Sequence, residues 1–247
     1  MKEKSILLGI LGGLGPMSTF YFCELLTAHT EAKTDADHID MLISSRATTP
    51  DRTAYILDKN APDPLPVMLC EAHRLEAAGV DLIVMPCNTA HYFYDGLAAS
   101  CHVPILNIID ETCAHLCNIG AKKFGLLATN GTIQAGAYER FCTPRGLTCI
   151  TPTKEEQAII SNIIFGQIKQ NKSVDMASFS RVVDALRARG CQKIVLGCTE
   201  LSLLKKEGLD DELFVDSLDV LAYRTILACG KTPVGFPTSF ERMEVAW

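Results

Sequence analysis

The chain has 247 residues, of which 48% are hydrophobic and 21% are charged, so it can bury a core and does not belong to the intrinsically disordered class. Its net charge of −6 argues against nucleic acid as a partner, because phosphate binding needs a concentrated positive surface. No stretch reaches the roughly 20 apolar residues that cross a bilayer, so no membrane partner is expected.

The chain begins MKEKSILLGILGGLGP, which we interpret as a strand entering a glycine loop and not as a signal peptide, because the apolar run is short and no cleavage site follows. Further along, runs rich in Ile, Leu and Val alternate with amphipathic segments. The pattern predicts, in chain order, a strand at 6–11, a helix at 67–78, strands at 82–85 and 124–128, a helix at 179–188 and a strand at 194–196. This alternation predicts an α/β fold with mainly parallel sheets.

An internal repeat relates the two halves of the chain. At an offset of 111 residues, a helix, a capping glycine, a strand and a terminal cysteine recur, with Gly79 falling on Gly190 and Cys87 on Cys198. Identities of this kind are also common between unrelated βα units, which explains the glycines better than the cysteines. We therefore expect two pseudo-symmetric lobes, each a mainly parallel sheet flanked by helices. The first lobe is expected to comprise 1–103 plus 209–247, and the second 104–208.

Cys87 in MPCNTAH and Cys198 in LGCTEL each follow a predicted strand. Ligands bind at the carboxyl ends of strands in α/β sheets, so both thiols should face a cleft between the lobes. A following helix N-terminus would lower the thiol pKa from about 8.5 toward neutrality. Two such thiols on opposite sides of one carbon could remove a proton from one face and return it to the other, which inverts a stereocentre.

The other nine cysteines are interpreted as small buried hydrophobes: Cys23, Cys70, Cys101, Cys113, Cys117, Cys142, Cys149, Cys191 and Cys229. Reduced thiols in this number, without a signal sequence, predict a cytoplasmic protein. The CAHLC segment and the pair formed by Cys87 and His91 both lack a second pair of ligands, so no metal site is expected.

The motifs resemble those of the aspartate/glutamate racemases, a family of cofactor-independent amino-acid racemases. The resemblance rests on GGLGP at 12–16, PDR at 50–52, MPCNTAH at 85–91, LLATNGT at 126–132 and GCTEL at 197–201. It implies two α/β lobes around an active-site cleft, commonly a homodimer, and no pyridoxal phosphate or other cofactor. Cys87 and Cys198 match the two catalytic bases of the family.

The resemblance also assigns substrate contacts. Asn88, Thr89, Thr132, Thr199 and the amides near Gly13 match positions that hold the α-carboxylate and amino group, although Asn and Thr at such places also cap helices. Arg52 matches a position that grips a side-chain carboxylate, and Lys169 a lysine that assists it in some aspartate-specific members. The alternatives are a turn arginine and a solvated lysine.

These inferences predict deprotonation at Cα in a dry cleft that closes by lobe movement. The substrate is expected to be aspartate, with glutamate possible. The alternatives are a hydantoin racemase or maleate isomerase on the same scaffold, and a binding protein that keeps the cleft without turnover.

Overall fold

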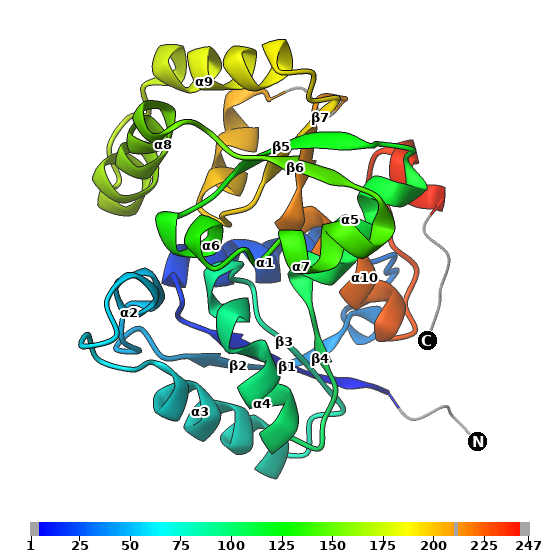
Figure 1. The fold of residues 1–247 in the computed structure, drawn as a ribbon. Coiled ribbons are helices and arrows are strands. Elements are labelled where there is room, and N and C mark those ends of the chain that lie inside the picture. The colour runs from blue at the N-terminus through cyan, green and yellow to red at the C-terminus, as the bar shows by residue number, and fades with distance from the viewer. Residues whose placement is uncertain (1–4, 210–211, 243–247) are drawn as a thin grey trace.

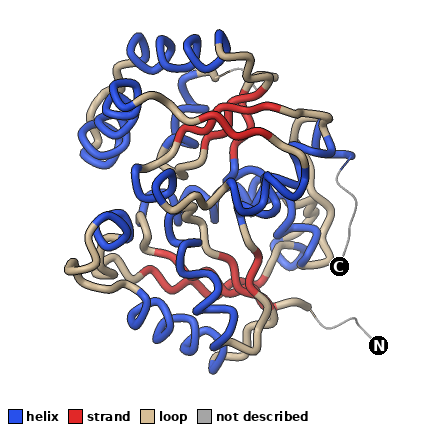
Figure 2. Tube along the Cα trace, in the orientation of Figure 1, coloured by secondary structure: helices blue, strands red, loops and turns tan. Residues whose placement is uncertain are grey.

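Two four-stranded parallel sheets form separate lobes in the computed structural model, which describes residues 5–209 and 212–242 (Figures 1 and 2). The strand order is β2-β1-β3-β4 in the first sheet and β6-β5-β7-β8 in the second, so the two sheets share one topology. Every strand pair within them is parallel. The predicted two-lobed α/β fold is therefore confirmed.

The strands are β1 (Leu7–Gly12), β2 (Asp40–Ser45), β3 (Leu82–Val84), β4 (Ile105–Leu106), β5 (Lys123–Leu127), β6 (Thr148–Ile150), β7 (Lys193–Leu196) and β8 (Phe214–Asp216). The α-helices are α1 (Pro16–Ala28), α2 (Arg52–Leu57), α3 (Leu65–Ala77), α4 (Tyr94–Ser100), α5 (Ile108–Asn118), α6 (Asn130–Gln134), α7 (Glu139–Cys142), α8 (Lys154–Ser161), α9 (Met176–Ala188) and α10 (Ser217–Ala228). Shorter 3-10 helices include η2 (Thr89–Phe93), η5 (Ile168–Gln170) and η6 (Leu201–Glu207), and η4 (Asn162–Gln167) is a π-helix.

The repeat found in the sequence corresponds to equivalent strands. Strand β3 starts 111 residues before β7, and β1 starts 116 residues before β5. Gly79 and Gly190 end α3 and α9 with φ of +84° and +85°, a left-handed conformation that favours glycine at a helix C-terminus. The sequence therefore predicted these helix ends correctly.

The helices pack on the two sheets through their apolar faces. Helix α9 buries Phe179, Val182, Val183 and Leu186, a 3–4 residue spacing that places them on one face against the second sheet. A continuous core joins the two lobes, because α1, α5 and α10 lie between the sheets and pack on one another (Figure 1). Among the described residues, no helix is long and apolar enough to cross a membrane.

The sheets divide the chain differently from the expected lobe boundaries at two places. Strand β4 lies beyond residue 103 yet pairs with β3 of the first sheet, and β8 lies beyond residue 208 yet pairs with β7 of the second. Both strands have only two or three residues, too few for a periodic signal. The chain does return to the first lobe after α10, where Thr30 and Pro233 form an antiparallel bridge.

Candidate active site

The two repeat-related cysteines line the same small cleft between the lobes. Cys87 follows β3 and Cys198 follows β7, at the carboxyl ends of equivalent strands. Their exposed fractions are only 6% and 4%. The cleft is also lined by five other residues that the sequence singled out: Arg52, Asn88, Thr89, Lys169 and Thr199.

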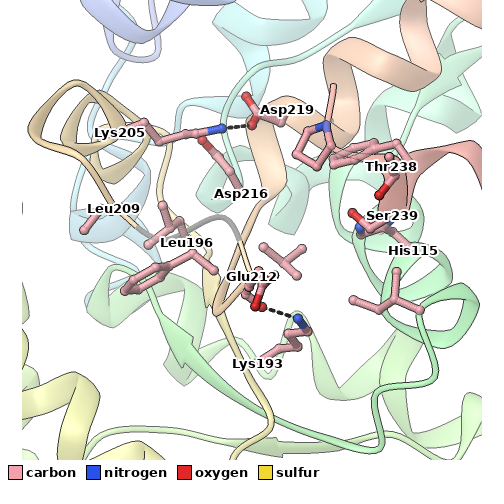
Figure 3. Close-up of a pocket in the computed structure, with 15 residues that line it drawn as sticks. His115, Lys193, Leu196, Lys205, Leu209, Glu212, Asp216, Asp219, Thr238 and Ser239 are labelled. Carbon is pink, nitrogen blue, oxygen red and sulfur yellow. Dashed lines mark hydrogen bonds and ion pairs between the residues drawn. The ribbon is translucent and has the colours of Figure 1, made fainter. Parts of the chain in front are cut away.

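The cleft is almost filled by its own side chains. It encloses about 10 Å³, which is roughly the space that one water molecule needs. A larger cavity of about 740 Å³ lies along β8 and includes Asp216, His115 and Lys193, but neither Cys87 nor Cys198 borders it (Figure 3). We take the smaller cleft as the candidate active site, because it holds the paired thiols. An amino acid is larger than this volume, so the cleft must open to admit one.

Cys198 belongs to a chain of polar contacts. Its thiol donates to Glu200 Oε2 at 3.0 Å, and Glu200 Oε1 lies 3.0 Å from Lys169 Nζ. Burial lowers the pKa of Lys169, but Glu200 and the thiols outweigh this effect and leave the pKa raised. Lys169 is therefore a charged member of the cleft and not a solvated lysine. Gly15 makes room for Glu200, since a Cβ on Gly15 would lie 2.7 Å from Oε1.

The thiol pKa values move in the opposite direction from the one expected. Burial raises the pKa of Cys87, although the charge of Arg52 opposes the increase. Burial raises the pKa of Cys198 well above its ordinary value, and the Glu200 carboxylate raises it further. The elements that follow both cysteines are short 3-10 helices, so no long helix dipole offsets the loss of solvent. In the closed cleft, burial therefore favours the neutral thiol over the thiolate at both positions.

Asn88 is held in one orientation by its neighbours. Its Nδ2 donates to Ser217 Oγ at 2.9 Å, and its Oδ1 accepts from the hydroxyl of Tyr138 at 2.8 Å. Thr199 Oγ1 donates to the Pro86 carbonyl at 3.3 Å. Asn88 therefore keeps its second N–H in a defined orientation, which anion recognition requires, whereas the single hydroxyl hydrogen of Thr199 is engaged.

Thr89 connects the lobes through a hydroxyl cluster. Its Oγ1 lies 2.9 Å from both Thr129 Oγ1 and Thr132 Oγ1. Thr132 thus supports Thr89 but does not line the cleft. Gly13 does not line it either: its N–H donates to Thr19 Oγ1 at 3.0 Å, so that amide is already engaged.

Arg52 is buried at the start of α2, and two of its nitrogens donate to backbone carbonyls. Nη2 donates to Leu14 at 2.7 Å, and Nη1 donates to Pro50 at 3.1 Å. These bonds fix the guanidinium beside the cleft. They use at most three of the five N–H groups of the guanidinium.

Sequence reasoning missed Glu200 and Thr129, which also line the cleft. Glu200 stands two residues after Cys198 in GCTEL, and this proximity was the available signal. Its partner Lys169 is more than thirty positions away, after a π-helix that the sequence pattern does not reveal.

His91 is a structural residue. Its Nδ1 donates to the Cys87 carbonyl at 2.8 Å, and its Nε2 accepts from the Ile108 N–H at 3.3 Å. Burial lowers its pKa to about 4, so the ring is neutral. Both nitrogens are engaged, which agrees with the view that Cys87 and His91 are not a ligand pair. The prediction that the other nine cysteines are buried is wrong for Cys70, which is exposed. It is confirmed for four of them, and another four are only half-buried: Cys23, Cys101, Cys117 and Cys149.

Several known proteins are similar to this chain in sequence and fold. A broad specificity amino-acid racemase of Bacillus subtilis, RacX, is 29% identical over 226 residues, which is 89% of this chain and 96% of that protein. An aspartate racemase of Picrophilus torridus superposes with a TM-score of 0.81 at 28% identity, covering 96% of this chain and 98% of that one. A glutamate racemase of Francisella tularensis, at 16% identity, covers 97% of this chain and 91% of its own with a TM-score of 0.62, which shows a shared fold.

The family profile described as Asp/Glu/Hydantoin racemase matches residues 11–225. The chain therefore belongs to the Asp/Glu/Hydantoin racemase family.

Proposed function

We propose that this protein interconverts L- and D-aspartate without a cofactor, with Cys87 and Cys198 as the catalytic acid/base pair. One observation carries the proposal: the two cysteines follow equivalent strands of two repeated lobes and line one small, closed cleft together. Two groups that approach a carbon from opposite sides are what inversion at Cα needs.

The surroundings of the thiols suggest a division of roles. Cys87 faces the Arg52 charge, which favours its thiolate, whereas Cys198 is the hydrogen-bond donor to Glu200. In one direction the Cys87 thiolate removes the Cα proton and the Cys198 thiol protonates the opposite face. The other direction starts from the state that this leaves, with a Cys87 thiol and a Cys198 thiolate, so that Cys198 acts as the base and Cys87 as the acid. Glu200 takes the Cys198 thiol proton only when the free enzyme passes between the two states. The second N–H of the Asn88 amide donates to the substrate carboxylate and stabilises the charge that develops beside it, and Thr199 adds a donor once its hydroxyl leaves the Pro86 carbonyl.

Aspartate is the favoured substrate because of the likeness to an aspartate racemase over nearly the whole of both chains. The second candidate is a broad specificity racemase, which the similarity to RacX favours. The structure offers one argument for it. Lys169 already pairs with Glu200, so its charge is not held in reserve for a substrate side-chain carboxylate.

Solvent exchange tests the proposal. Purified protein is incubated in deuterium oxide with L-aspartate, L-glutamate or an aliphatic amino acid and no added cofactor, and α-deuteration and D-isomer formation are followed. We expect both signals with aspartate. Absence of exchange with every amino acid would refute the proposal of an amino-acid racemase. The remaining alternatives would then be a hydantoin racemase, a maleate isomerase or a binding protein without catalytic turnover.

Single-thiol variants test the mechanism. Cys87→Ala and Cys198→Ala should each lose inversion, while each retains exchange of only the enantiomer whose Cα–H faces the remaining thiol. Cys70→Ala is the matched control, because Cys70 is exposed on α3 and should leave the rate unchanged. Racemisation that survives in Cys87→Ala would remove that thiol from the mechanism.

We also propose that the protein acts in the cytoplasm as a homodimer. All eleven cysteines are free, which suits a reducing compartment. The dimer follows from the family resemblance alone, and light scattering after size-exclusion chromatography measures it directly.

A further inference from the structure

Three potential metal ligands meet on the first lobe, outside the cleft. They are His73 and Glu76 of α3, and Cys101, the residue after α4. One ligand atom from each residue lies within 4.8 Å of the others. Sequence analysis did not bring these residues together, because Cys101 is 25 positions beyond Glu76.

Ordinary helix geometry builds this cluster. His73 and Glu76 are three residues apart on α3, so their side chains project from the same face. Helix α3 packs against α4, and the Cys101 N–H donates to Leu97 as the C-terminal cap of α4. In Figure 1 α4 runs away from the second lobe, so its C-terminal end, where Cys101 is the cap, lies on the side of the first lobe that is remote from the second.

Neighbouring backbone groups orient two of the ligands. Glu76 Oε1 accepts hydrogen bonds from the N–H groups of His102 at 2.7 Å and Val103 at 3.2 Å. One ring nitrogen of His73 lies 3.1 Å from the Ser100 carbonyl. Hydrogen bonds of this kind fix ligand orientation in known metal sites.

The ligand set selects the ion. Mg²⁺ and Ca²⁺ favour oxygen ligands only, whereas Zn²⁺ accepts sulfur, imidazole nitrogen and carboxylate oxygen in a tetrahedral arrangement. A fourth position can be taken by water or by His102, whose side chain is 96% exposed and whose Nδ1 lies 3.3 Å from Glu76 Oε1. We propose that His73, Glu76 and Cys101 bind one Zn²⁺ ion that ties α3 to the end of α4.

Binding exchanges the Cys101 thiol proton for the metal, and the proton leaves to solvent. No oxidation or reduction is involved. The expected effect is a more stable first lobe, because the ion adds a further link to the hydrogen bonds that already join α3 to the end of α4.

The test must separate this site from the cleft thiols, which can also bind zinc. Zn²⁺ is therefore titrated by calorimetry into the full chain carrying Cys87→Ala and Cys198→Ala. We expect one equivalent to bind, and Co²⁺ in its place to give a thiolate charge-transfer band. Adding Cys101→Ser should weaken binding by at least about tenfold and abolish the band.

Two further variants keep the result interpretable. Cys70→Ser removes an exposed thiol of the same helix and should leave affinity unchanged, and His73→Ala tests the site without altering any cysteine. Zinc should raise Tm in the Cys70→Ser background but not in the Cys101→Ser or His73→Ala background. Failure to bind zinc, or affinity unaffected by both Cys101→Ser and His73→Ala, would overturn the proposal.

Discussion

The Cys198 thiol donates to Glu200 Oε2 at 3.0 Å, while the other oxygen of the same carboxylate binds Lys169. A buried thiol with its own carboxylate acceptor has a route for its proton that does not require solvent. Cys87 lacks an equivalent carboxylate among the described residues that line the cleft within hydrogen-bond reach, and it faces Arg52 instead. The repeated lobes therefore carry unequal surroundings for the two thiols.

Glu200→Gln should lower kcat by about 100-fold or more, because an amide can accept the hydrogen bond but cannot take the proton. The two enantiomers have equal free energy, so kcat/KM must fall equally in both directions. Racemisation is followed by circular dichroism from each enantiomer. Glu200→Asp keeps a carboxylate and should lose less activity, whereas full activity in Glu200→Gln would contradict the proposed role.

Lys169→Met should shift the rate profile to higher pH. The Lys169 charge lowers the pKa of both thiols, so its removal makes each thiolate harder to form. It also leaves Glu200 buried without its cation, at a cost of about 1–2 kcal/mol of stability. Rates measured from pH 6 to pH 10 check the shift. Lys172→Met, an exposed lysine nearby, is the control and should leave the profile in place.

The site illustrates what a single sequence can and cannot predict. Cys87 and Cys198 were identifiable because the repeat aligns them, and Gly79 and Gly190 because left-handed helix ends select glycine. The contact between Lys169 and Glu200 was not identifiable from the sequence. It depends on how a π-helix and the 3-10 helix after it orient the Lys169 side chain. The direction of the thiol pKa shifts was also missed, because burial in a closed cleft is a tertiary property. Strands as short as β4 carry no periodic signal.

Gly13→Ala should destabilise the fold by about 2–4 kcal/mol. Gly13 has φ of +80°, and an added Cβ would lie 2.4 Å from the backbone nitrogen of Arg46, so strain and steric overlap add together. Gly146→Ala separates these effects, because Gly146 has φ of +69° with nothing near its Cβ, and it should cost about 1 kcal/mol. Urea unfolding measures both. If both variants lost the same unfolding free energy, the backbone around Gly13 would have shifted to relieve the steric overlap.

Asp216→Asn should change how stability depends on pH. Burial and the neighbouring Asp219 raise the pKa of Asp216 to about 7. Figure 3 shows Asp216 beside the ion pair formed by Lys205 and Asp219. A carboxyl group with a raised pKa favours folding below its unfolded pKa of about 4. That contribution is lost as the pH rises through about 7.

Asparagine removes the charge yet keeps the oxygen that accepts from Ser202 Oγ and the Leu218 N–H, so the cap of α10 survives. The variant should match the parent near pH 4 and exceed its unfolding free energy by about 2–4 kcal/mol at pH 8. Burial lowers the pKa values of His91 and His115 to about 4, so these residues reduce the stability of both proteins at acid pH. Taking the difference in unfolding free energy between the two proteins cancels this effect. A difference that stays constant from pH 4 to pH 8 would mean that Asp216 is ionised throughout this range in the folded protein.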